Sequence, residues 1–295
     1  MRPKFIAVVL YLLSLSYSSY ASDSFEETEL ETQSSFGFST SYNDDDNSDF
    51  SLDLNWEFPG HQNIWLIYSE SESNQTGSDS ESYQVGVSTD LYQTFSIGVE
   101  FSYLNVDDLL ETRTLKNELS LSFENWGLSY NPQLTAISFK LTRTSEDSYY
   151  DLYAMGHELA ASYYGWQNNF INVRFFNNHI SNPPASIENS AIHNLIVSTF
   201  PQIILLDIRT EFLATNLEKN RVALSLGHFF SWGNLIAQWM RSEFLYTDGY
   251  VSNIALSLDY QLHKSIGIDF GVGTQIYSID NDKTNYLITG LRFFW

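Results

Sequence analysis

The segment Phe50-Ser51-Leu52-Asp53-Leu54-Asn55-Trp56-Glu57-Phe58 decides the fold, because every second residue in it is apolar and the residues between are polar. Successive side chains of a β-strand point to opposite faces of the sheet. This period of two therefore predicts a strand with one apolar and one polar face. The same alternation recurs in residues 254–260 and 266–272. No window of comparable length shows a helical period, so the sequence predicts an all-β protein.

Applied along the whole chain, the pattern predicts sixteen strands, or fourteen if one hairpin is misassigned. The weakest candidate is residues 127–142, because Pro132 has no N–H for a sheet ladder and is expected at a bulge or a strand end. The predicted strands begin near residues 34, 49, 62, 81, 94, 114, 127, 153, 167, 190, 203, 221, 234, 251, 265 and 284.

The connections between these strands alternate between two kinds. The longer ones, such as residues 69–82 and 143–152, hold 19 of the 36 acidic residues, and the short ones hold only Glu124. Short turns that alternate with longer polar loops are typical of a transmembrane β-barrel with an even number of strands. The short connections are residues 59–62, 91–94, 124–127, 164–168, 200–203, 231–234 and 261–265.

Aromatic residues gather near both sets of connections. Trp and Tyr rings settle at the membrane–water boundary, so two such bands predict aromatic girdles. The tryptophans in or near short turns are Trp56, Trp65, Trp126, Trp166 and Trp232. The tyrosines at the opposite strand ends include Tyr68, Tyr83, Tyr103, Tyr277 and Tyr286.

The last segment alternates again, with Leu287, Thr289, Leu291, Phe293 and Trp295 forming one set. It resembles the C-terminal strand of Gram-negative outer-membrane proteins, which ends in an aromatic residue. The resemblance covers only this strand. It implies an antiparallel up-and-down β-barrel in the bacterial outer membrane, and a signal in Leu291, Phe293 and Trp295 that the barrel-assembly machinery recognises. A secreted β-sandwich also alternates, but it needs neither girdles nor a terminal aromatic residue.

The N-terminus has the features of a cleaved signal peptide. Arg2 and Lys4 precede a short apolar run, and small residues end at Ala21. The run is shorter than the ~20 residues that a membrane-spanning helix needs. The predicted parts are a signal peptide at residues 1–21, an acidic periplasmic tail (or a small plug) at 22–33, and the barrel at 34–295.

The chain is strongly acidic, with a formal net charge of −22. Such a charge would repel the phosphates of nucleic acid, which excludes that class of partner. The predicted partners are outer-membrane lipids and lipopolysaccharide, with divalent cations shared at acidic loops such as residues 44–46. The aromatic content of 16% predicts a folded chain, because disordered acidic chains are poor in aromatic residues.

If the apolar stripes face lipid, the other strand residues line the interior. Carboxylates outnumber cations there, and a negative, water-filled interior predicts a monomeric pore with a weak preference for cations or small polar solutes. The predicted inward acidic residues are Asp53, Glu57, Asp90, Glu100, Glu118, Glu158, Asp207, Glu211, Asp259 and Asp269. The predicted inward basic residues are Lys116, Lys140, Arg174, Arg209, Arg221 and Arg292.

One segment suggests catalysis, Asn178-His179-Ile180-Ser181-Asn182. It is similar to the histidine–x–serine–asparagine motif of outer-membrane phospholipase A, which implies that His179 activates Ser181 for lipid hydrolysis. Pro183 stands where that family has glycine, and Asn194 is a loose match for the asparagine that orients the histidine.

Three functions stay open on this basis: the pore, a non-conducting barrel for envelope structure, adhesion or partner binding, and a lipid hydrolase. The other histidines have no metal-ligand spacing. The favoured interpretation is a protein that is not an enzyme and needs no metal or cofactor.

Overall fold

A computed structural model describes residues 34–44, 47–58, 62–73, 78–92, 94–106, 110–142, 147–166, 168–181, 218–244, 249–278 and 283–295. No helix in these ranges is long and apolar enough to cross a membrane. The strands are β1 (Ser35–Asn43), β2 (Asn47–Phe58), β3 (Gln62–Ser73), β4 (Ser78–Tyr92), β5 (Phe95–Val106), β6 (Leu110–Phe123), β7 (Trp126–Thr142), β8 (Asp147–Trp166), β9 (Asn169–Ser181), β10 (Glu218–Phe230), β11 (Gly233–Phe244), β12 (Tyr250–His263), β13 (Ile266–Tyr277) and β14 (Lys283–Phe294).

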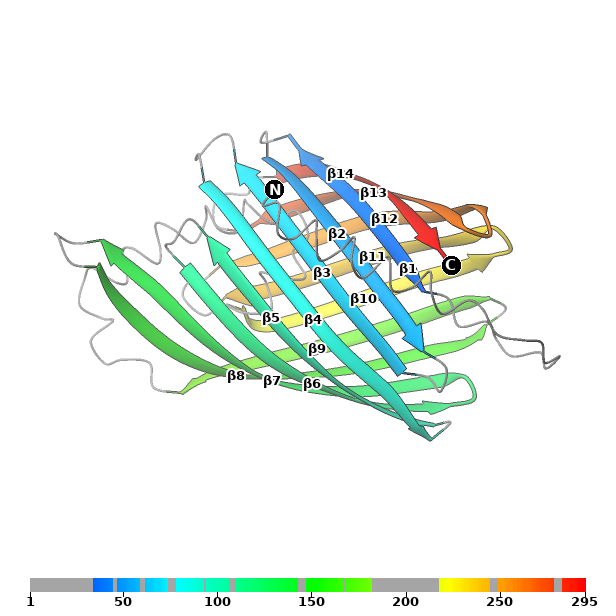
Figure 1. Ribbon diagram of the computed structural model, residues 1–295, viewed down its shortest axis with the longest axis horizontal. Coiled ribbons are helices and arrows are strands. Elements are labelled where there is room, and N and C mark those ends of the chain that lie inside the picture. The colour runs from blue at the N-terminus through cyan, green and yellow to red at the C-terminus, as the bar shows by residue number, and fades with distance from the viewer. Residues whose placement is uncertain are drawn as a thin grey trace. The chain divides into compact units, whose positions relative to one another are not determined.

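These strands form one closed antiparallel barrel (Figure 1). Each pairs with its neighbours in sequence, and β1 pairs with β14, where Ser35 lies opposite Phe294. Beyond that pair, the N–H of Ser34 donates to the carbonyl of Trp295 and the N–H of Trp295 donates back, each at 3.1 Å. Closure gives every strand a partner on both sides, as a hydrocarbon environment requires. The predicted all-β barrel is confirmed.

The described strands number fourteen, the lower of the two predicted counts. β9 pairs directly with β10, where Arg174 lies opposite Ala223, so no strand stands between them in the wall. The two strands predicted near residues 190 and 203 fall in residues 182–217, outside the described residues. The predicted signal peptide and acidic tail, residues 1–33, also fall outside them.

The two ends of the barrel differ in their connections. The turn end is the end at which β2 connects to β3, β4 to β5, and so on to β12 and β13. Six of the seven short turns lie there as predicted, and the seventh, at 200–203, is outside the described residues. At the opposite loop end, strands run farther than predicted. β8 begins at Asp147, inside the predicted loop 143–152. Backbone pairing does not depend on side-chain polarity, so it continues past the apolar band into the acidic segments.

Pro132 lies inside β7, and not at a bulge or strand end as predicted. On one side it is opposite His157 of β8. On the other side, Gln133 pairs with Lys116 and Tyr130 pairs with Leu119 in the same register, but the two pairs between them are missing. The proline is tolerated because its missing N–H falls in this interruption of the β6–β7 ladder.

Aromatic rings line the turn end as predicted, except that Trp65 pairs with Asn55 and Gly86 and so has the inward parity. The ring centroids of Trp126 and Tyr163 are 4.7 Å apart, and those of Trp232 and Tyr260 are 5.4 Å apart. These two pairs belong to different turns, so the girdle follows the rim across several strands.

The tyrosines of the loop end are only partly as predicted. The ring of Tyr83 lies 5.1 Å from that of Tyr68 and 6.2 Å from that of Tyr103 on the exterior. Tyr286 instead faces inward, where its hydroxyl donates to Asn253 at 2.8 Å. Tyr277 has the inward parity too, so neither residue belongs to a girdle.

Gly233 is the glycine whose backbone conformation matters most. It begins β11 with a φ of 153°, and a Cβ there would lie 1.9 Å from the carbonyl oxygen of Asp259. Because that obstacle is the backbone of β12, we expect Gly233→Ala to lower the free energy of unfolding by about 1–3 kcal/mol. Urea unfolding of the refolded barrel in detergent measures this. The control is Gly127→Ala, whose Cβ would meet Ser162 at an ordinary 3.7 Å; equal losses in both variants would contradict the prediction.

Candidate functional site

The two faces of the wall follow from the cross-strand pairs, because paired residues point to the same side. Val85, Phe101 and Leu115 pair in succession across β4, β5 and β6 and are all exposed, which marks the exterior. Residues of the opposite parity face the interior. Eight of the ten carboxylates predicted to face inward belong to described residues, and all have the inward parity. They are Asp53, Glu57, Asp90, Glu100, Glu118, Glu158, Asp259 and Asp269.

Four of the predicted inward cations share that face, namely Lys116, Arg174, Arg221 and Arg292. The side chain of Lys140 is outside the described part of the chain, as are Asp207, Arg209 and Glu211. Lining of a pore by any of these residues stays a prediction.

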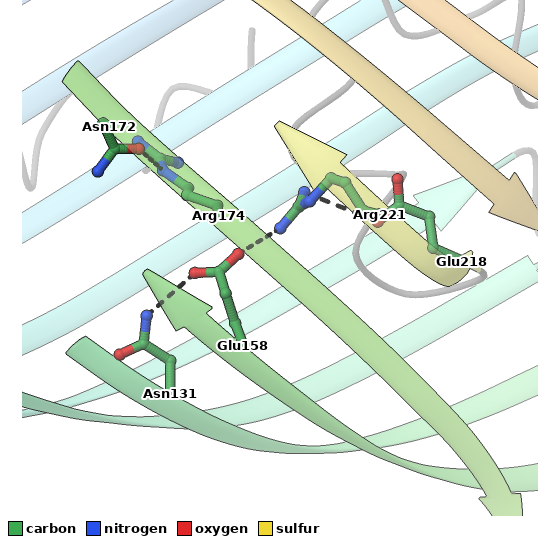
Figure 2. Close-up of polar contacts among 6 residues, drawn as sticks. All are labelled: Asn131, Glu158, Asn172, Arg174, Glu218 and Arg221. Carbon is green, nitrogen blue, oxygen red and sulfur yellow. Dashed lines mark hydrogen bonds and ion pairs between the residues drawn. The ribbon is translucent and has the colours of Figure 1, made fainter. Parts of the chain in front are cut away.

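The best-defined contact on the inward face is an ion pair between Glu158 of β8 and Arg221 of β10. Figure 2 shows the two side chains pointing toward each other across the intervening strand β9. Arg221 NH2 lies 2.5 Å from Glu158 Oε2, and Asn131 of β7 donates to Glu158 Oε1 at 3.0 Å. Arg221 and Glu158 are only 6% and 9% exposed. One polar network therefore joins β7, β8 and β10 across the intervening β9.

A second carboxylate, Glu218, lies on the other side of Arg221. Its Oε2 is 3.7 Å from Arg221 NH1, and its side chain is fully buried. Strict alternation would give Glu218 the outward parity of Val222 and Leu224. The register shifts between Glu218 and Asn220, and this irregularity turns the carboxylate inward. The sequence offered no signal for it, because a bulge is not visible in a period of two.

Arg174 of β9 is held in place nearer the turn end. Its Nε donates to Asn172 Oδ1 at 3.1 Å, and Asn172 Nδ2 donates to Ser162 Oγ at 2.7 Å (Figure 2 shows the first bond). These residues border a cavity of about 530 Å³ whose lining also includes Lys116, Glu118 and Asn131. The cavity is bordered by both signs of charge and by neutral donors and acceptors, so it can solvate a small polar solute or an ion.

A different arc of the wall is acidic. Asp269 of β13 lies directly opposite Asp259 of β12, and its Oδ2 is 3.2 Å from Arg292 NH2 of β14. Asp53 of β2 extends over β1, where a Cβ on Gly37 would come within 2.6 Å of its Oδ1. Three carboxylates face one cation in this region. No group of His, Asp or Glu side chains among the described residues is arranged to hold a metal ion.

The interior also differs along its length. Toward the loop end, inward side chains such as Ser51, Thr112, Thr135 and Gln275 are almost completely buried. Toward the turn end, inward residues such as Asp90 are exposed. The inward side chains are therefore more exposed toward the turn end than toward the loop end.

Comparisons with known proteins agree on the architecture. No protein-family model matches the sequence, and no curated protein sequence does. Among solved structures, an outer-membrane-expressed protein, OmpT of Vibrio cholerae, is similar with a TM-score of 0.51, 10% identity, and coverage of 92% of this chain and 100% of that one. CdiB from Acinetobacter baumannii has a TM-score of 0.50 and 9% identity, with coverage of 90% and 61%. The KdgM porin has a TM-score of 0.45 and 9% identity, with coverage of 88% and 98%.

The fold is that of a bacterial outer-membrane barrel. The exterior agrees, because large apolar side chains such as Val87, Leu134 and Ile254 are about half exposed on the outer face of the closed sheet and would be costly in water. The chain therefore belongs to the outer membrane.

The residues of the phospholipase-like segment alternate between the two faces of β9, and Asn178 is buried with the inward parity. His179 lies opposite Met155 of β8 and is exposed on the exterior face. Ser181 ends β9, and its side chain and Asn194 are outside the described part of the chain. The structure thus supplies no described partner for His179.

The Glu158–Arg221 pair gives a test of the network. We expect Glu158→Leu to lower the free energy of unfolding by about 3 kcal/mol, because it removes the nearer of the two carboxylates beside a buried guanidinium. Asp269→Leu is the matched control. Its pair with Arg292 is 24% and 36% exposed, so its loss should cost about 1 kcal/mol or less.

Urea unfolding in detergent compares the two variants. Addition of Arg221→Met and Glu218→Gln to Glu158→Leu should recover part of the loss, since no buried charge of this cluster then remains without a partner. A triple variant no more stable than Glu158→Leu would show that these charges are not the source of the effect.

Proposed function

We propose that this chain is a narrow outer-membrane pore with a weak preference for cations and small polar solutes. The observation that carries the proposal is the composition of the inward face. Eight predicted carboxylates share it with four predicted cations among the described residues, and two of those cations, Arg221 and Arg292, are already paired with carboxylates. A wall of carboxylates attracts cations to a water-filled pore.

The width of the barrel is compatible with such a role. Barrels of about 8 strands are filled by their own side chains, and those of about 16–18 leave an aqueous channel. Fourteen strands lie nearer the second group. The inward residues of several strands are small, for example Ser88, Gly98 and Ser120, which leaves room for water.

The acidic arc made by Asp53, Asp259 and Asp269 is the part of the wall that would act as the filter. Asp269 has one cationic partner, Arg292, and this pair is partly exposed to water. The opposite arc, from β6 to β10, carries Lys116 and Arg174 beside Glu118 and Glu158. Charges of both signs across one interior produce weak selectivity and not exclusion of anions.

A second candidate is a non-conducting barrel that serves envelope structure or partner binding. The burial of inward side chains in the loop half favours it, because side chains such as Ser51 and Thr135 have almost no contact with water. The two candidates differ in one measurable property, the current through a folded, inserted barrel.

Single-channel recording in a planar bilayer with a salt gradient decides between them. The pore should give discrete, small steps and a cation-selective reversal potential. Asp53→Asn combined with Glu57→Gln should move that potential toward zero, because it removes two inward carboxylates of β2. Glu70→Gln, on the exterior parity of β3, is the control and should leave it unchanged. A folded, inserted protein without current would contradict the pore and support the second candidate.

A further inference from the structure

The exterior carries a polar patch at the depth of the hydrocarbon. It consists of Asn117 of β6, Tyr130 and Pro132 of β7, and His157 of β8, here called the β6–β8 patch. All four have the outward parity: Asn117 pairs with the exposed Val99, Tyr130 with the exposed Leu159, and His157 with both Pro132 and the exposed Asn177. Tyr130 and His157 stack with a centroid separation of 5.9 Å and 5° between planes, and Tyr130 Oη lies 2.7 Å from His157 Nδ1.

The position of the β6–β8 patch along the strands excludes contact with headgroups. On its turn side, Leu119 and Leu159 both pair with Tyr130. On its loop side, Leu115 pairs with Leu134 and Leu134 with Met155, and all three are exposed. Apolar, lipid-facing residues thus lie on both sides of the patch along each strand. The patch is therefore within the apolar band of the barrel.

Two polar groups of the patch, the amide of Asn117 and Nε2 of His157, have no hydrogen bond within the described barrel. Asn117 is exposed, and its amide has no hydrogen bond to a described residue. The contact from Tyr130 uses only Nδ1 of His157. The β6–β7 ladder is interrupted here, next to Pro132, so backbone pairing is incomplete at the same place. Hydrocarbon can satisfy none of these groups, and each is costly to leave unpaired there.

Other polar residues on the exterior, in contrast to Asn117, do have hydrogen-bond partners. Asn177 of β9 donates to Asn220 of β10 at 2.7 Å, and Asn220 donates to Glu243 of β11 at 3.3 Å. These exterior side chains satisfy one another along a row of paired strands. This row adjoins the β6–β8 patch, because Asn177 lies opposite His157. Asn117 is on the far side of the patch, where it lies opposite the apolar Val99 and has no such polar neighbour.

We infer that the β6–β8 patch is a self-association surface that binds a second copy of this chain in the membrane, in place of the monomer predicted from the sequence. An amide carries donors and an acceptor, and an imidazole with one N–H carries one of each. Two identical patches can therefore satisfy each other across a two-fold axis, where each residue meets its counterpart or neighbour. Uncharged groups also avoid the repulsion that the acidic exterior of β3 and β4 would cause, where Glu70 faces Glu81 and Glu72 faces Asp79.

The absence of cysteine from the chain makes the test specific. Leu134→Cys places one thiol beside the β6–β8 patch, and Val272→Cys places one on the exterior of β13, where Val272 is also exposed. Each full-length variant is cross-linked in membranes with a short bismaleimide. We expect a product of twice the chain mass from Leu134→Cys and little from Val272→Cys. Equal yields from the two positions, or a product containing a different protein, would overturn the inference.

A second pair of variants separates association from folding. In the Leu134→Cys background, Asn117→Leu with His157→Leu should weaken dimerisation by about tenfold or more, the effect of losing one or two hydrogen bonds. Thr289→Leu, an exposed polar residue on the exterior of β14, should leave it unchanged. The folded state is checked by resistance to unfolding in unheated detergent gels. Folded double variants that still cross-link fully would overturn the inference.

Discussion

The structure depends on one requirement, that backbone N–H and C=O groups find partners inside the protein wherever hydrocarbon surrounds it. The pairing of β1 with β14 meets this requirement for the sheet as a whole, since it removes both edges. It also explains why the interruption at Pro132 matters more here than in a soluble sheet, where water would bond the unpaired groups. The place where backbone pairing is incomplete is also the place where Asn117 and His157 face outward. The defect in the ladder and the polar side chains thus belong to one patch.

Most of the architecture follows from two features of the sequence, the period of two and the alternation of turn lengths. Both arise from local physics, since side-chain parity and turn geometry need no knowledge of distant residues. The strand count does not follow in the same way. Alternation identifies segments that can form a strand, but only the pairing of β9 with β10 shows which segments make the wall. The inward direction of Tyr286 was missed for a related reason, because a tyrosine near a strand end is compatible with either face.

The inward face itself could be predicted, and its partnerships could not. Parity gives the side of each residue, whereas a contact such as Glu158–Arg221 spans a whole strand and joins residues 63 positions apart. It depends on strand stagger and on the concave curvature of the wall, which a linear pattern does not contain. For Glu218, even the side of the wall could not be predicted from parity. One extra residue in β10 reverses the parity locally. Strict alternation, which gives the right side for the neighbouring residues, therefore gives the wrong side for this carboxylate.

The seam between β1 and β14 also shapes how the chain can fold. Among the described strands, all the remaining pairings join strands that are neighbours in sequence. These pairings have a low contact order, so hairpins can form step by step. The seam alone joins residues from opposite ends, such as Ser35 and Phe294. Closure entropy rises only with the logarithm of loop length, so this step costs little more than a long hairpin once the other strands are ordered. If the seam forms last, a partly assembled barrel is open between its first and last strands, and an assembly factor would act at that opening.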